Sequence, residues 1–137
     1  MSLVLDASVA IAWAYSTEIT QSVRDVFERV KARGAWVPAI WRLEVANVLE
    51  LNVRRGRSTE EFRDSTLNAF ASFPIQTDPE TSRQAWGATV RLMTKYQLTS
   101  YDAAYLELAL RRSLPLATLD EDLQAACAEE KVVLLGV

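Results

Sequence analysis

The chain opens with a short apolar segment, one acid and a longer apolar run: residues 3–13 read LVLDASVAIAW. Leu3–Leu5 predicts a brief β-strand, and the apolar run Ala7–Trp13 that follows has helical character. Asp6 stands between the two, at the carboxyl end of the expected strand. In open parallel sheets, functional groups gather just beyond the carboxyl ends of the strands. This stretch therefore predicts an α/β fold and a first candidate site residue.

The same alternation of short apolar strands and helical patterns continues along the chain. Further strands are expected at Ala35–Val37, Phe73–Gln76, Leu114–Ala117 and Val132–Leu135. Between them lie helical patterns around residues 19–33, 39–54, 58–70, 79–96, 102–110 and 119–128. The pattern of about four or five strands and about seven helices predicts a mostly parallel sheet with helices on both faces. No linker marks a boundary, so we expect a single domain over residues 1–137.

Three local signals predict where helices begin. Ser58 followed by Glu61, and Thr99 followed by Asp102, have the spacing of a capping box. Asp78-Pro79 places proline at the first position of another helix. The helix over residues 39–54 is apolar on most sides, so we expect it to be buried.

Composition excludes several kinds of chemistry. The 137 residues include no histidine and one cysteine, Cys127. Histidine-based triads and imidazole metal ligands are therefore absent, as are an internal disulfide and a cysteine-rich zinc site. Whatever reaction occurs must use carboxylates, hydroxyls, Lys or Arg, or a metal held by oxygen ligands. The tryptophans are expected to pack in the core or at a dimer interface. For Tyr101 and Tyr105 core packing is the expectation, with a place lining the site as the alternative.

The N-terminal segment predicts a cytoplasmic protein. MSLVLDASVA has no basic region before its apolar stretch, and Asp6 interrupts that stretch, so we expect no signal peptide. The apolar runs are also far shorter than the ~18 residues of a membrane span.

Several acids fall where a parallel sheet would bring them together. Asp6 and Asp120 follow two expected strands, with Asp122 close behind the second. Asp102 heads a nearly all-apolar helix whose first turn should face the same sheet edge. Helix capping is the alternative explanation for each of these aspartates.

Glu44 needs another explanation, because it lies within an apolar helical stretch where no cap is required. Asn47 lies three residues further on and shares its helix face. A buried carboxylate is costly unless it has partners, so Glu44 either joins the other acids or pairs with an arginine across the core.

Convergence of these acids would require a cation. Two carboxylates about 4 Å apart repel by roughly 4 kcal/mol at an effective dielectric of about 20. Mg²⁺ or Mn²⁺ is the natural occupant of such an all-oxygen site, and it lowers the pKa of bound water in place of the missing histidine. The candidate set is Asp6, Glu44, Asp102, Asp120 and Asp122.

The charge balance fits a polyanionic substrate. The chain has a net charge of −3, from 15 basic and 18 acidic residues, so the remainder carries a slight positive charge once the five candidate acids are set aside. Six arginines are candidate phosphate contacts, with solvated helix ends and turns as the alternative explanation: Arg54, Arg55, Arg57, Arg63, Arg111 and Arg112.

Four short motifs, in order and spread over the whole chain, resemble those of the PIN-domain ribonucleases and of VapC-type toxins from toxin–antitoxin pairs. They are VLDAS at residues 4–8, EVAN at 44–47, SYDAAY at 100–105 and ATLDEDL at 117–123. The resemblance implies a three-layer α/β/α sandwich around a short-stranded, mostly parallel sheet. It also implies RNA hydrolysis, a homodimer and a small cognate antitoxin.

The resemblance assigns roles to individual residues. It implies Mg²⁺ or Mn²⁺ held by Asp6, Glu44, Asp102 and Asp120, which are also the catalytic candidates, with Asp122 at a less regular fifth metal position. Ser8 and Thr118 match hydroxyl positions that support the metal or substrate, and Asn47 matches a polar neighbour of the acids.

Other functions remain open at this stage. A non-toxin PIN nuclease would share the same acids, and an inactive binding module would use them only as helix caps. A receiver-type phosphoacceptor would need a lysine at the end of a late strand, whereas Lys131 precedes the last one. A Toprim-like site would need an early glutamate after a strand, and an Asp-x-Asp phosphatase fails at Ser8. No residue chooses among possible RNA targets.

Overall fold

The computed structural model describes residues 2–15 and 19–137. Within these ranges, five short strands form one parallel sheet in the order β3-β2-β1-β4-β5. The strands are β1 (Val4–Leu5), β2 (Ala35–Val37), β3 (Ile75–Thr77), β4 (Leu116–Ala117) and β5 (Leu134–Leu135). The central position of β1 places the residue that follows it, Asp6, at the middle of one sheet edge.

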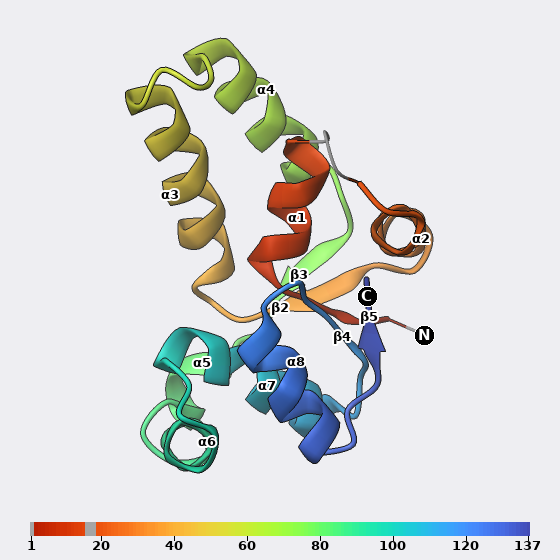
Figure 1. Ribbon diagram of the computed structural model, residues 1–137, viewed down its shortest axis with the longest axis vertical. Helices are drawn as coiled ribbons and strands as arrows, with labels where there is room; N and C mark the ends of the chain where they lie inside the picture. Colours follow the sequence, from red (N-terminus) through yellow and green to blue (C-terminus); the bar gives the residue numbers. More distant parts are fainter. Residues whose placement is uncertain (1, 16–18) are drawn as a thin grey trace.

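Helices cover both faces of this sheet (Figure 1). On one side lie α1 (Ala7–Ala14), α2 (Gln21–Arg33), α3 (Trp41–Arg54) and α4 (Glu60–Ala71). On the other lie α5 (Thr81–Gln84), α6 (Ala88–Tyr96), α7 (Ser100–Arg112) and α8 (Glu121–Glu129). The predicted three-layer α/β/α sandwich with a parallel sheet is confirmed. In the described part of the chain, no helix has the length and apolar character needed to cross a membrane.

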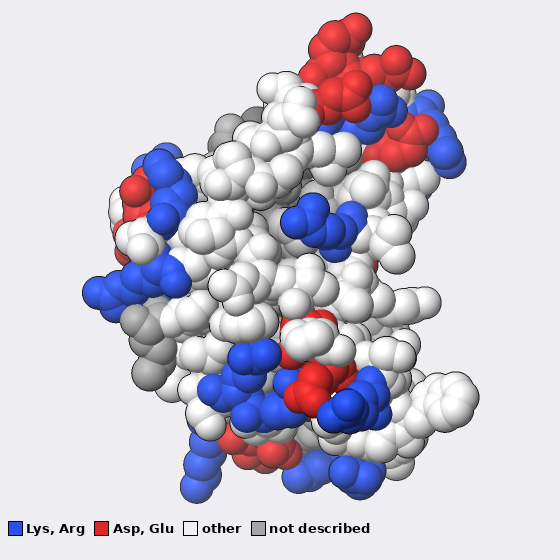
Figure 2. All heavy atoms as spheres, turned by 180° about the vertical axis from the view of Figure 1, so that it is seen from behind, with Lys and Arg blue, Asp and Glu red and all other residues white. Residues whose placement is uncertain are grey.

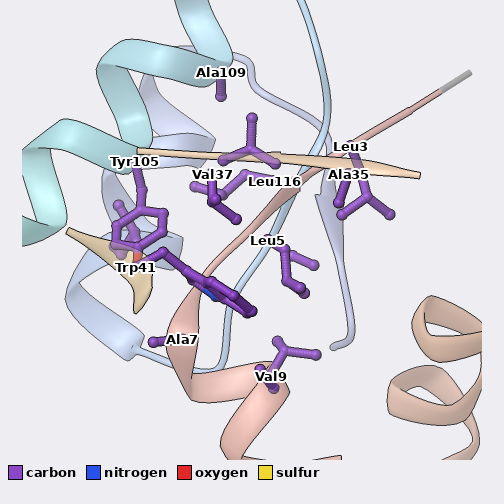
Figure 3. Packing of buried hydrophobic residues seen from close by; sticks show 14 of the residues in the cluster. Leu3, Leu5, Ala7, Val9, Ala35, Val37, Trp41, Tyr105, Ala109 and Leu116 are labelled. Carbon is purple, nitrogen blue, oxygen red and sulfur yellow. The ribbon is translucent and has the colours of Figure 1, made fainter. Parts of the chain in front are cut away.

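The core lies where α7 and the central strands meet. Leu3, Val4 and Leu5 are all fully buried, as expected for a strand covered on both faces. Along α7, every residue from 103 to 109 is buried. Figure 3 shows Tyr105 of α7 and Trp41 of α3 reaching into the cluster formed by strand residues. The helix that carries Asp102 is therefore held firmly against the sheet.

Two predicted helix starts are wrong in detail. The cap of α4 is Thr59, whose hydroxyl accepts from the backbone N–H of Phe62, so the expected Ser58 box is displaced by one residue. The helix expected after Asp78-Pro79 is broken into α5 and α6, because Gly87 leaves the helical conformation. The Thr99 cap is confirmed, since its hydroxyl accepts from the N–H of Asp102.

Helix α3 is also less buried than its composition predicts. Trp41, Val45 and Leu49 face the core, whereas Leu43 is 72% exposed. The helix packs against α1 and α4 along one side, which leaves its other side in solvent. The expectation that it would be buried is wrong for that reason.

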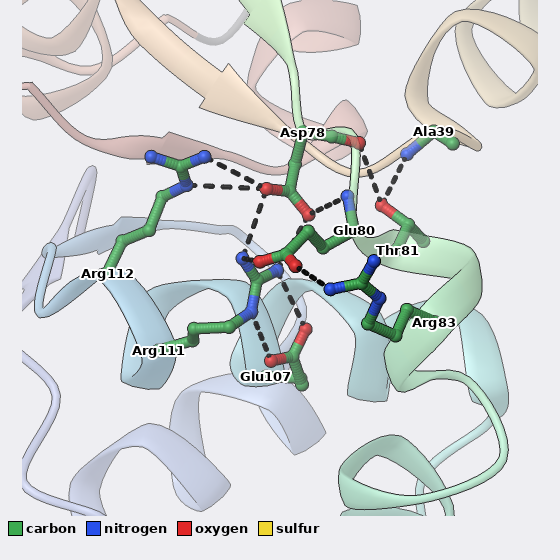
Figure 4. Close-up of polar contacts among 8 residues, drawn as sticks. All are labelled: Ala39, Asp78, Glu80, Thr81, Arg83, Glu107, Arg111 and Arg112. Atoms are coloured by element: carbon green, nitrogen blue, oxygen red, sulfur yellow. Dashed lines mark hydrogen bonds and ion pairs between the residues drawn. The ribbon is translucent and has the colours of Figure 1, made fainter.

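A network of ion pairs ties the end of β3 to α7 (Figure 4). Asp78 directly follows β3 and is buried, with its Oδ2 2.6 Å from Arg111 Nη2 and its Oδ1 3.1 Å from Arg112 Nη2. Arg111 also pairs with Glu107, and the guanidinium of Arg112 stacks on the Trp36 ring at 3.6 Å. Burial opposes the charged form of Asp78, but the hydrogen bonds from the two arginines outweigh it and lower the pKa.

Four of the six arginines that were candidate phosphate contacts form ion pairs within the protein. Arg111 and Arg112 belong to the Asp78 network, while Arg54 and Arg63 both pair with Glu50. On the face seen in Figure 2, basic side chains gather in separate groups, most of them beside acidic ones. Neutralised pairs of this kind contribute little to RNA attraction, because their charge is already compensated.

We expect Asp78→Asn to lower the free energy of unfolding by roughly 3 kcal/mol, because it removes the negative charge that compensates two part-buried arginines. Arg83→Ala is the control: Arg83 pairs with Glu80 in the same region, but its side chain is 77% exposed, so the loss should stay below about 1 kcal/mol. Urea unfolding monitored by circular dichroism measures both. Equal losses would show that burial does not distinguish the two pairs.

Candidate active site

Asp6 is a buried carboxylate that does not act as a helix cap. It occupies the N-cap position of α1 but makes no capping hydrogen bond from its side chain. Its Oδ2 instead accepts hydrogen bonds from the hydroxyls of Ser8, at 2.5 Å, and Thr118, at 2.8 Å. Asp6 is only 5% exposed. The capping explanation is therefore wrong for Asp6, and the predicted supporting hydroxyls do contact it.

The loop after β4 is held by the same two hydroxyls that contact Asp6. The backbone N–H of Leu119 donates to the Ser8 hydroxyl at 3.0 Å, and that of Asp120 donates to the Thr118 hydroxyl at 3.1 Å. Asp120 then caps α8, since its Oδ2 accepts from the N–H of Leu123 at 2.8 Å. Asp120 thus has a real capping role, while its position is tied to Asp6 through two hydroxyls.

Glu44 and Asp102 reach the site from the first turns of two helices. Glu44 lies in α3 and is half-buried, and its Oε1 accepts a hydrogen bond of 2.6 Å from the hydroxyl of Tyr105. Asp102 lies in α7, three residues before Tyr105, so the two share one helix face. The expected alternative of an arginine partner for Glu44 is wrong, because its hydrogen-bond partner in the described chain is a tyrosine.

The pKa values indicate that these carboxylates repel one another. Burial is the main cause that raises the pKa of Asp102 to about 6, and the charges of Asp120, Asp6 and Asp122 raise it further. Burial likewise raises the pKa of Glu44, with added repulsion from Asp6 and Asp102 opposed by the Tyr105 hydrogen bond. Burial also raises the pKa of Asp6, against the hydrogen bonds from its hydroxyl partners.

Acids from four separate segments therefore share one electrostatic environment. They come from the ends of β1 and β4 and from the starts of α3 and α7. No arginine or lysine is among the causes that shift the pKa values of Asp6, Glu44 and Asp102. Among the described residues, however, no three acidic or cysteine side chains lie close enough together to hold a metal ion as they stand. The site is a converging group of acids rather than a closed ligand cage.

The remaining predicted site residues lie at the periphery. Asp122 is exposed on α8 and acts on Asp102 through its charge. Asn47 is exposed on α3 and its side chain makes no hydrogen bond with any described residue, so its role at the site stays a prediction.

One residue at the site was not among the predicted ligands. Tyr105 was expected to be core packing and is fully buried, yet its hydroxyl contacts Glu44; its position three residues after Asp102 was the available signal. The core expectation is wrong for Tyr101, which is 59% exposed beside Asp102.

Solved structures share this fold at low sequence identity. PAE2754 from Pyrobaculum aerophilum is 24% identical, with a TM-score of 0.71 over 98% of this chain and 83% of that chain. VapBC2 from Rickettsia felis, bound to a DNA fragment from its promoter, is 14% identical, with a TM-score of 0.65 over 98% and 97%. VapC20 from Mycobacterium tuberculosis, a Sarcin-Ricin loop cleaving toxin, is 17% identical, with a TM-score of 0.56 over 90% and 94%. No curated protein matches the chain in sequence.

A family-level match covers nearly the whole chain. The sequence model of the PIN domain matches residues 3–129, a range that runs from the residue before β1 to the last residue of α8. It contains all five candidate acids together with Ser8, Thr118 and Tyr105. The chain belongs to the PIN-domain family.

Proposed function

We propose that this protein is a divalent-metal-dependent endoribonuclease and the toxin of a toxin–antitoxin pair. PIN domains are nucleases. The observation that carries the proposal is the mutual repulsion of Asp6, Glu44, Asp102 and Asp120 at one sheet edge, in a chain without histidine. Concentrated negative charge without a basic partner favours a site that takes up a cation and, with it, a phosphate.

The donor chemistry fits Mg²⁺ or Mn²⁺. All the converging groups are carboxylates, and hard cations of this kind prefer oxygen ligands. We assign Asp6, Glu44, Asp102 and Asp120 as ligands, with Asp122 adding charge from further out. The carboxylates must draw closer when the cation binds, since as they stand no three of the described acids form a ligand cage.

A bound cation would neutralise phosphate charge and supply an activated water molecule. The protein's own groups would arrange the reactants. The Ser8 and Thr118 hydroxyls hold Asp6 in place, and we assign to Asp102 or Asp120 the role of orienting the attacking water. Hydrolysis by water leaves 5′-phosphate and 3′-hydroxyl ends.

The toxin assignment draws support from the solved structures with the same fold. VapC20 is a Sarcin-Ricin loop cleaving toxin, and VapBC2 was solved on promoter DNA. By this likeness we propose RNA as substrate, a small antitoxin as partner and a homodimer as the assembled form. A PIN nuclease outside toxin–antitoxin pairs is the alternative, and RNA cleavage without toxicity on expression would favour it.

We expect Mn²⁺ to raise the melting temperature of the wild-type protein, because a ligand that binds only the folded state stabilises it. Glu44→Gln should lose much of that rise, since it removes one assigned ligand. Glu129→Gln, an exposed change on α8, is the control and should retain it. Differential scanning fluorimetry with and without Mn²⁺ measures all three. A wild-type melting temperature unmoved by Mn²⁺ would contradict the metal site.

Without metal, the site acids should make the fold less stable as the pH rises. The pKa of Asp102 is raised from 3.8 to about 6, so the folded state binds this proton more tightly than the unfolded state. The stability that this proton contributes is present at low pH and is lost as the pH rises through about 6. In EDTA, Asp102→Asn should therefore match the wild type near pH 4 and exceed its stability at pH 7. If the variant is less stable at both pH values, Asp102 serves the fold rather than the site.

We expect Asp102→Asn to lower RNA cleavage by at least about 100-fold, the scale of loss when a group that orients or activates the nucleophile is removed. The variant should keep the circular dichroism spectrum of the wild type. Cleavage of a single-stranded RNA library, with end-group analysis of the products, measures rate and chemistry together. Products with 2′,3′-cyclic phosphate ends, or cleavage that EDTA leaves intact, would overturn the proposed mechanism.

A further inference from the structure

A hydrogen bond from Tyr105 links α7, which bears Asp102, to Glu44 of α3 at the site end of both helices. The residue is 0% exposed, and its hydroxyl donates to Glu44 Oε1 at 2.6 Å across 61 positions of sequence. A phenol has a single hydrogen to donate, and here it is directed at a carboxylate rather than at a backbone carbonyl. The contact therefore connects a fully buried anchor on α7 to a half-buried acid on α3.

This geometry constrains Glu44 in a specific way. A glutamate side chain has several rotatable bonds, and holding it in one rotamer costs conformational entropy. The Tyr105 hydroxyl holds Oε1, while Oε2 accepts no hydrogen bond from any residue that the structure describes. One oxygen is anchored and the other has no described partner, in a carboxylate that lies close enough to Asp6 and Asp102 for their charges to act on it.

We propose that Tyr105 is a positioning residue for the cation site, holding one oxygen of Glu44 so that the other is presented to the metal. The inference rests on the proposed function, because it assumes that Glu44 is a ligand. It adds that the metal affinity depends on a buried tyrosine that contacts neither metal nor RNA. Partners of metal-binding side chains typically change metal affinity by 10–100-fold when they are removed.

The test is the Mn²⁺ dissociation constant of Tyr105→Phe, measured without RNA by the electron paramagnetic resonance signal of free Mn²⁺. The variant keeps the ring in the core and removes only the hydroxyl, so we expect the affinity to fall at least tenfold. Tyr101→Phe is the matched control, because it makes the same change on the same helix at an exposed residue with no described hydrogen bond. It should bind Mn²⁺ as the wild type does.

A double variant separates positioning from a general loss of packing. If Tyr105 acts through Glu44, then Tyr105→Phe should weaken Mn²⁺ binding little or not at all when Glu44→Gln is already present. Additive losses, or unchanged affinity in the Tyr105→Phe variant, overturn the inference while leaving the proposed function intact. A wild-type protein that binds no Mn²⁺ overturns both.

A measurement on the wild-type protein covers the case in which Tyr105→Phe does not fold. The chain has four tyrosines, which can be labelled with ¹³C at the ring carbon that bears the hydroxyl and assigned from Phe variants of the other three. Mg²⁺ should shift the Tyr105 signal, because the cation draws charge from the carboxylate that accepts the hydrogen bond of this tyrosine. The Tyr96 signal should not move, since its hydroxyl is bonded to Glu130, the residue that follows α8. An unmoved Tyr105 signal at saturating Mg²⁺ contradicts the proposal.

Discussion

The structure around the end of the central strand depends on one buried carboxylate, that of Asp6, which must be compensated by hydrogen bonds. β1 is covered on both faces, so Asp6 follows it into an environment where an unpaired charge is expensive. Two hydroxyls from opposite parts of the chain, Ser8 on α1 and Thr118 after β4, compensate for part of that cost. Those hydroxyls in turn accept from the backbone that leads into α8, so the acid, the loop and the helix hold one another in place.

Two buried aspartates of this fold have opposite surroundings. Asp78 and Asp6 each directly follow a strand, and both are buried. Asp78 is paired with Arg111 and Arg112, and its pKa is lowered. Burial raises the pKa of Asp6, whose hydrogen bonds come from uncharged donors and which lies near another acid, Asp120. The fold thus neutralises the charge of Asp78 and gives Asp6 no basic partner among the described residues, which is what the proposed cation site requires.

The helix starts show which features can be predicted from neighbouring residues in the sequence and which cannot. The Thr99 box was predictable because a cap involves residues three apart in sequence and needs no tertiary partner. The helix expected from Pro79 begins instead at Thr81 and is interrupted at Gly87. The ion pairs of Arg111 and Arg112 with Asp78 were not predictable, because the partners lie more than thirty residues apart. Neither of the two explanations open for these arginines, a phosphate contact or a solvated helix end, describes such a pair, since no local pattern records a distant partner.

The sequence by itself determined the α/β class, the strand order along the chain and the identity of the acids, because apolar periodicity and residue type are local properties. Only the tertiary structure decided which of those acids meet and what holds them. The hydrogen bond from Tyr105 to Glu44 and the pairing of Arg111 with Asp78 both join distant segments, and burial then determines which charges remain uncompensated. That selection depends on which helix faces are covered, which follows from packing rather than from any motif.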